Sequence, residues 1–190
     1  MATGNFLSIT NLTVSFDGFK AVDDLNFSVD EGELRVVIGP NGAGKTTLLD
    51  MICGKTKPTN GTIKFRDLEL TQMIEYQINR AGVGRKFQTP SIYEDLTVLE
   101  NLEISFPEKR SVAGCLFFKR TAEIMEKIET VAAQIFLTEE LGTKAGLLSH
   151  GQKQWLEIGL CLTQDPELLL LDEPVAGMSA REREQTAELL

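Results

Sequence analysis

The sequence has little of what several protein classes require. It contains one histidine and three widely spaced cysteines, Cys53, Cys115 and Cys161, with no C-x-x-C pair. This spacing argues against both a disulfide framework and a zinc site, so we expect reduced cysteines. No stretch approaches the roughly 18 apolar residues of a membrane helix, and residues 1–10 lack the basic segment and apolar run of a signal peptide. If the protein serves a membrane, we expect another subunit to span it.

Positive charge is scarce as well. Nineteen Lys and Arg stand against 28 Asp and Glu, which gives a net charge of -9. Nucleic-acid binding depends on clustered positive charge, so we expect no nucleic-acid partner. The length of 190 residues and a hydrophobic fraction of 42% suffice for one folded globular domain.

Apolar periodicity predicts β structure in the first part of the chain. Residues 12–16 and 25–29 alternate apolar and polar side chains, as half-buried strands do. Leu34–Ile38 is a short, β-branched run that predicts a strand buried on both faces. A helix is expected from Gly44 to Met51, and a strand at Thr62–Phe65 after a turn.

The pattern changes to helical spacing from Thr97 to about Leu147, with apolar residues recurring every three or four positions. We interpret this segment as a helical insertion. Strand character returns at Leu168–Leu171, and Ser179 with Glu182 forms a capping box that opens a last helix. Strands and helices alternating around an insertion predict an α/β fold with a parallel core.

A phosphate-binding loop follows the Leu34–Ile38 run. Its sequence, Gly39-Pro40-Asn41-Gly42-Ala43-Gly44-Lys45-Thr46, matches G-x-x-x-x-G-K-[ST] without substitution. The glycines let backbone N–H groups face phosphates, and the next helix presents its positive end. Lys45 would reach the β- and γ-phosphates of ATP, and the Thr46 hydroxyl would ligate Mg²⁺. The loop therefore predicts nucleotide binding.

Two acids, Asp172 and Glu173, follow the Leu168–Leu171 run. Taken alone, they fit a solvated turn at the end of a strand. Beside a phosphate loop, they predict a pair in which Asp172 faces the metal shell and Glu173 acts as general base on the attacking water.

The order of motifs resembles the ABC ATPase family over essentially the whole chain. Gln88 follows the phosphate loop, and Leu148-Ser149-His150-Gly151-Gln152 precedes the acid pair. The resemblance implies a P-loop NTPase fold with an N-terminal antiparallel β subdomain and an inserted α-helical subdomain. It implies one ABC ATPase domain over residues 1–190, with a nucleotide-binding core at 1–88 and 149–190 and a helical subdomain at about 89–148.

The family resemblance also implies roles for further residues. Gln88 would sense Mg²⁺ and the γ-phosphate, as a catalytic and metal-site residue. Ser149, Gly151 and Gln152 would contact the nucleotide of a second, head-to-tail subunit, and Thr47 would join the phosphate loop. Phe16 falls where the family stacks an aromatic ring on adenine, although its alternation with Leu12 and Val14 also fits a core residue, in which case Phe19 is the substitute.

Three stretches, beginning at Gly84, Leu148 and Asp172, resemble the urea-uptake branch, a relative of the branched-chain amino acid importers. That likeness implies an ATPase driving uptake of urea or short amides, with branched-chain amino acids as the alternative. It implies two transmembrane permeases, a second ATPase subunit as homo- or heterodimer and an extracytoplasmic binding protein. The chain would be cytoplasmic, on the inner face of the cell membrane.

Two departures from the family pattern bear on activity. His150 replaces a glycine, and we interpret it as a local hydrogen-bonding or packing residue without a catalytic role. The family's switch histidine follows a strand beyond Asp172-Glu173, whereas this sequence stops at Leu190. We therefore expect the C-terminal part of the fold to be missing and hydrolysis to be weak. A nucleotide-binding module with little turnover is the rival; a DNA-repair ATPase and a small-molecule kinase fit the motifs less well.

Overall fold

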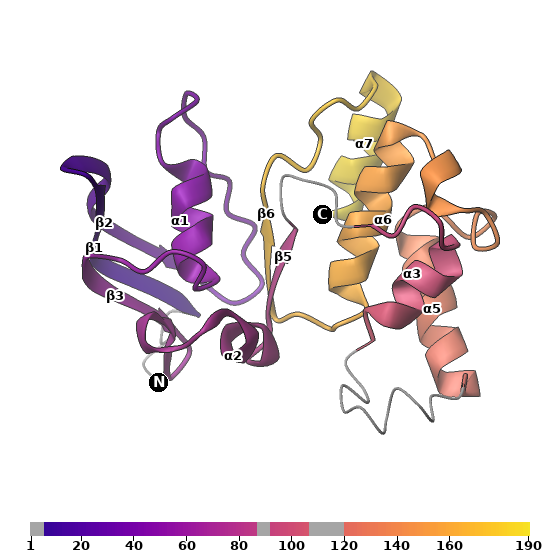
Figure 1. Cartoon of the computed structure of the whole chain (residues 1–190), viewed down its shortest axis with the longest axis horizontal. Helices are drawn as coiled ribbons and strands as arrows, with labels where there is room; N and C mark the ends of the chain where they lie inside the picture. Colours follow the sequence, from indigo (N-terminus) through magenta and orange to yellow (C-terminus); the bar gives the residue numbers. More distant parts are fainter. Residues whose placement is uncertain (1–5, 87–91, 107–119) are drawn as a thin grey trace. The chain divides into compact units, whose positions relative to one another are not determined.

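The computed structural model describes residues 6–86, 92–106 and 120–190 (Figure 1). The chain forms two compact units, Met1–Val83 and Gly84–Leu190. We describe each unit by itself.

The first unit is built on an antiparallel sheet with strand order β2-β1-β3-β4. Its strands are β1 (Leu7–Phe16), β2 (Phe19–Val29), β3 (Asn60–Phe65) and β4 (Leu68–Glu69). Leu7 pairs with both Val29 and Phe65, so β1 is the central strand of this part of the sheet. The alternation in the sequence therefore predicts β1 and β2 correctly, and the strand expected after a turn at Thr62–Phe65 corresponds to β3.

Helix α1 (Lys45–Ile52) packs beside this sheet (Figure 1). It buries Leu48, Met51 and Ile52, which lie on one face at helical spacing. The turn η1 (Leu70–Gln72) and helix α2 (Glu75–Arg80) follow and complete the unit. Because α1 is held by its apolar face, its N-terminus and the phosphate loop before it have a fixed support.

The predicted strand at Leu34–Ile38 is wrong. Residues 33–40 form no strand, and Ile38 is 88% exposed. A β-branched apolar run indicates that its side chains favour burial, but a strand also needs a hydrogen-bonding neighbour. None of the described strands pairs with this run.

Strand β5 (Val83–Lys86), of which all but Val83 belongs to the second unit, pairs with β6 (Leu168–Leu171) in a two-stranded sheet. The apolar run at 168–171 predicts β6 correctly. The sequence does not indicate β5, because two of its four residues, Arg85 and Lys86, are charged. Both side chains are buried and form ion pairs.

Helices make up the rest of the second unit: α3 (Val98–Ile104), α5 (Ala122–Gln134), η2 (Ala145–Leu147), α6 (His150–Leu162) and α7 (Ala180–Leu189). In the described part of residues 97–147 no strand occurs, in agreement with the helical spacing. Of the helices in the described ranges, α5 and α6 are the longest, with 13 residues each. Among the described residues, no helix has the length and apolar character needed to cross a bilayer.

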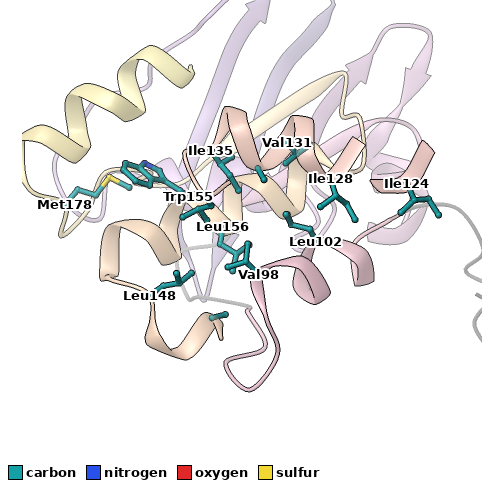
Figure 2. Packing of buried hydrophobic residues seen from close by; sticks show 13 residues of the cluster. Val98, Leu102, Ile124, Ile128, Val131, Ile135, Leu148, Trp155, Leu156 and Met178 are labelled. Carbon is teal, nitrogen blue, oxygen red and sulfur yellow. The ribbon is translucent and has the colours of Figure 1, made fainter. Parts of the chain in front are cut away.

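One apolar cluster holds these helices together (Figure 2). Ile124, Ile128 and Val131 of α5 face Val98 and Leu102 of α3, all with 2% exposure or less. The cluster continues through Leu156 and Trp155 of α6 to Met178. Burying each such side chain contributes about 1.5–3 kcal/mol, so this cluster fixes the position of α6 and the loop before α7.

Candidate functional site

The phosphate loop of the first unit leads directly into α1. Gly44 is the N-cap residue of α1, with φ 86 and ψ 6. It offers no side chain to the first N–H groups of the helix, and the first turn contains no acidic residue. These N–H groups and the positive end of the helix dipole therefore remain available to an anion.

Gly44 also brings the loop against the sheet. A Cβ built on Gly44 would lie 2.4 Å from the carbonyl oxygen of Ala21 and 3.2 Å from Cγ2 of Val22, both in β2. Gly42 has the same backbone conformation, with φ 82, but a Cβ there would meet nothing within 4 Å. Only the second glycine is thus needed for close approach as well as for its φ angle.

The Lys45 side chain lies across the loop. Its Nζ donates hydrogen bonds to the carbonyl oxygens of Gly39 at 2.7 Å and Pro40 at 2.9 Å. The Ala43 N–H donates to Pro40 O at 3.2 Å and closes the turn. The ammonium group therefore lies over the same backbone that the motif assigns to phosphate binding.

Two aromatic rings stand at the tip of the β1–β2 hairpin. Phe16 pairs with Phe19 across Asp17 and Gly18, which both have positive φ, as in a two-residue type I′ turn. Leu12 and Val14 are buried, whereas Phe16 is 49% exposed and Phe19 is more exposed still. Phe16 is therefore not a core residue, and both rings are accessible for stacking.

In the second unit, Asp172 and Glu173 directly follow β6 and lie in different environments. Asp172 is 4% exposed, and its Oδ2 lies 3.7 Å from Nη2 of Arg85, which is also buried. That distance is too long for a hydrogen bond, and Oδ2 accepts none from the described residues. The oxygen is therefore an acceptor that a cation or a cation-bound water would satisfy.

Glu173 is exposed and has a positive φ of 48. This left-handed conformation costs a residue with a Cβ about 1–2 kcal/mol. The Ala176 N–H donates to Glu173 O at 3.1 Å and fixes the turn. The exposed Glu173 and the buried Asp172 thus lie in different environments, as expected if the two acids have different roles.

Ser149 caps the N-terminus of α6. Its Oγ accepts a hydrogen bond from the Gln152 N–H at 3.2 Å, and the Gln152 side chain accepts one from the Ser149 N–H at 2.9 Å. Gly151 follows in the first turn, and a Cβ on it would lie 2.1 Å from Oε1 of Glu182. The segment thus forms a capped helix start in which the Glu182 carboxylate fills the space beside Gly151.

His150 connects this helix start to the turn after Glu173. Its Nε2 lies 3.1 Å from Ala176 O, and because a carbonyl only accepts, Nε2 is the donor. A Cβ on Gly177, which has φ 72, would lie 2.7 Å from the same Nε2. The predicted local hydrogen-bonding role of His150 is confirmed.

The sequence did not indicate a buried ion pair in the second unit. Lys86 Nζ lies 3.3 Å from Glu157 Oε2. This ion pair joins β5 to α6. Burial raises the pKa of the nearby Cys161 thiol to about 12, and the Glu157 carboxylate adds to the rise. A charged residue does not by itself indicate burial, even where its neighbours are apolar, as Leu156 and Ile158 are beside Glu157.

The structure places the predicted residues in two groups. The phosphate loop from Gly39 to Thr46, Thr47 and Phe16 belong to the first unit, and Asp172, Glu173, Ser149, Gly151 and Gln152 belong to the second. Gln88 lies outside the described residues.

The sequence is similar to a known protein family and to proteins of known function. A family model for the ABC transporter matches residues 22–176. The high-affinity branched-chain amino acid transport ATP-binding protein LivG of Escherichia coli is 36% identical over 191 residues, covering 97% of this chain and 75% of that protein. A probable branched-chain amino acid transport ATP-binding protein LivG of Methanocaldococcus jannaschii is 35% identical over 182 residues. That match covers 93% of this chain and 71% of the relative.

Solved structures show the same fold. The ADP conformation of MJ1267, an ATP-binding cassette of an ABC transporter, superposes with a TM-score of 0.84 at 33% identity, over 98% of this chain and 76% of that chain. The cbiO1 subunit from Clostridium perfringens, part of the ABC transporter complex cbiONQ, gives a TM-score of 0.82 at 25% identity, over 97% of this chain and 72% of that one. The predicted fold class, with a parallel core and an antiparallel β subdomain, is confirmed. The chain belongs to the ABC transporter family, as a P-loop subunit that binds and hydrolyses ATP.

Proposed function

We propose that this chain is the ATPase subunit of an importer for branched-chain amino acids. The observation that carries the proposal is the 36% identity to LivG over 97% of the chain. The chain would work with permease subunits, a second ATPase subunit and an extracytoplasmic binding protein. It would lie on the inner face of the cell membrane through its contact with the permeases.

Uptake of urea or short amides is the second candidate. It rests on the stretches beginning at Gly84, Leu148 and Asp172, which resemble the urea-uptake branch. The ATPase subunit contacts ATP and not the transported molecule, so neither resemblance reports on substrate contacts directly. For the choice of substrate class, the similarity to LivG over 97% of the chain is stronger support than three short motifs.

In the proposed cycle, the phosphate loop holds the triphosphate of ATP. The N–H groups at the start of α1 and the Lys45 ammonium supply positive charge, and an exposed ring of Phe16 or Phe19 supplies a stacking surface for adenine. The nucleotide-binding core would comprise residues 1–88 and 149–190, and the helical subdomain residues at about 89–148.

We propose Mg²⁺ as the accompanying cation. Magnesium keeps several waters and is bound through one or two protein oxygens plus substrate phosphates. The buried Oδ2 of Asp172, which accepts no hydrogen bond from the described residues, fits such a role. Thr46 in the first turn of α1 and Gln88 would complete the set, and the cation would offset charge on the transferred phosphate.

Glu173 is the proposed general base. Its exposed carboxylate would take a proton from the water that attacks the γ-phosphate, and Gln88 would help to orient that water. Ser149, Gly151 and Gln152 would contact the nucleotide bound by the second subunit, through the hydroxyl and N–H groups at the start of α6.

Transport specificity is tested by ATPase stimulation in the reconstituted transporter. The complete complex is placed in lipid vesicles, and its binding protein is supplied with leucine, isoleucine or valine, or with urea or acetamide. We expect ATP hydrolysis to rise with the branched-chain amino acids. Stimulation by urea and acetamide alone would overturn the proposal and favour the second candidate.

A further inference from the structure

The carboxylate of Glu182 lies at the N-terminus of α6, although Glu182 itself belongs to α7. Ser149 Oγ donates a hydrogen bond to Oε1 of Glu182 at 3.4 Å. Oε2 of the same carboxylate accepts hydrogen bonds from the Ser179 N–H at 2.8 Å and the Ser179 hydroxyl at 2.7 Å. One carboxylate therefore joins the N-cap residues of two helices.

This carboxylate also covers Gly151. A Cβ at Gly151 would lie 2.1 Å from Oε1 and 2.4 Å from Cδ of Glu182. The space next to the Gly151 backbone is thus filled by negatively charged oxygen. Ser149 and Gly151 are two of the three residues proposed above to contact the nucleotide of the second subunit.

The position suits an anion for a general reason. The start of α6 presents N–H groups and the positive end of a 13-residue helix, which stabilise a carboxylate and a phosphate alike. Hydrogen bonds from Ser179 lower the pKa of the Glu182 carboxyl, with a smaller contribution from Ser149. The side chain is therefore an anion at neutral pH, and two anions repel each other at contact distance.

We propose that Glu182 is a built-in competitor for the anion position at Ser149 and Gly151, and that it must withdraw before the γ-phosphate of ATP on the second subunit can reach these residues. The inference rests on the role proposed above for Ser149 and Gly151. By occupying this position, Glu182 raises the ATP concentration that is needed for the two subunits to close.

The unequal hydrogen bonds make this withdrawal feasible. The contact with Ser149 is long, whereas both contacts with Ser179 are short. Glu182 can therefore leave the start of α6 while it remains the capping-box partner of Ser179 in α7. The side chain is half-buried, so it has room to turn.

The test compares steady-state ATP hydrolysis of the purified transporter with wild-type, Glu182→Gln and Glu184→Gln subunits. Glutamine keeps the capping box of α7 but removes the charge. Glu184→Gln removes an exposed charge from the same helix and is the matched control. We expect Glu182→Gln to lower the KM for ATP by about five- to tenfold, with kcat within about twofold of wild type.

Ionic strength provides a second measurement on folded protein. Because salt screens the repulsion, the difference in KM between wild type and Glu182→Gln should shrink as NaCl rises from low to about 0.5 M. An unchanged KM in Glu182→Gln, or an equal decrease in Glu184→Gln, would overturn the inference.

A Ser149→Ala variant separates this inference from the proposed function. If Ser149→Ala leaves hydrolysis and KM at wild-type values, the proposed role of Ser149 is wrong and the Glu182 proposal is overturned with it. If Ser149→Ala impairs hydrolysis but Glu182→Gln leaves KM unchanged, the proposed function stands and only the role of Glu182 is wrong.

Discussion

Gly42 and Gly44 show how one residue type serves two purposes within a loop. Both have left-handed backbones, which cost any residue with a Cβ about 1–2 kcal/mol. Only Gly44 also lies against backbone atoms of β2. The G-x-x-x-x-G-K-[ST] pattern requires the second glycine for packing on the sheet as much as for contact with phosphate.

Alanine at these two positions should therefore differ in cost. Both variants lose about 1–2 kcal/mol of unfolding free energy through φ, and Gly44→Ala adds an overpacking cost of ~1–3 kcal/mol. Urea unfolding followed by circular dichroism measures both. Equal losses for the two variants would contradict the close approach of Gly44 to Ala21.

The Cys161 thiol should be inert while the protein is folded. With a pKa of about 12, its thiolate fraction at pH 8 is ~10⁻⁴, and the thiolate is the reactive form. We expect iodoacetamide at pH 8 to leave the Cys161 peptide unlabelled in folded protein and to label it in 8 M urea, as read by mass spectrometry. Labelling of Cys161 at similar rates in both conditions would show that the thiol is not buried.

At the scale of elements, a buried hydrogen bond joins helix α7 to α6. Trp155 Nε1 donates to Thr186 Oγ1 at 2.9 Å, and both groups are buried. Thr186 Oγ1 in turn lies 2.8 Å from Glu182 O, to which it donates within the helix. The bond therefore links the helix that carries Ser149 and Gly151 to the helix that carries Glu182.

Thr186→Val should destabilise the second unit by about 1–3 kcal/mol, because it keeps the shape but leaves the buried indole N–H without an acceptor. The fluorescence of Trp155, the single tryptophan, reports unfolding in urea. Thr130→Val is the matched control, since the Thr130 hydroxyl donates only to Glu126 O on the exposed face of α5. A loss of stability no greater for Thr186→Val than for this control would contradict the account.

Elements with clear apolar periods are the ones the sequence predicts. The strands β1, β2, β3 and β6 and the buried face of α5 follow their patterns, and Ser179 caps α7 as its capping box indicates. Periodicity does not predict β5, because its charged residues are buried through ion pairs. It also fails at Leu34–Ile38, where apolar character is present without a pairing strand.

The site follows the same division. Motif spacing predicts the phosphate loop and the acid pair, whereas the cap that Ser149 forms at the start of α6 was not predicted. The contact between Glu182 and Gly151 joins residues 31 positions apart, and no local pattern encodes it. Likewise, the exposure of Phe16 could not be read from alternation, which also fits a core residue.

At the scale of the whole molecule, residues with proposed roles toward ATP occur in both units. The loop and the aromatic tip proposed to bind ATP are in residues 1–83, and the acids and helix start proposed for hydrolysis and for the second subunit's nucleotide are in residues 84–190. The matched relatives are longer than this chain, which covers about three quarters of their length.

The most direct test of the account is ATP hydrolysis by the assembled transporter with wild-type or Glu173→Gln subunits. Loss of the general base should reduce kcat by ~10²–10⁴ while ATP binding, measured separately with labelled ATP, is retained. Glu167→Gln, which removes an exposed carboxylate from the other end of β6, is the control and should hydrolyse ATP at the wild-type rate. Equal rates for wild type and Glu173→Gln would show that Glu173 does not activate the attacking water.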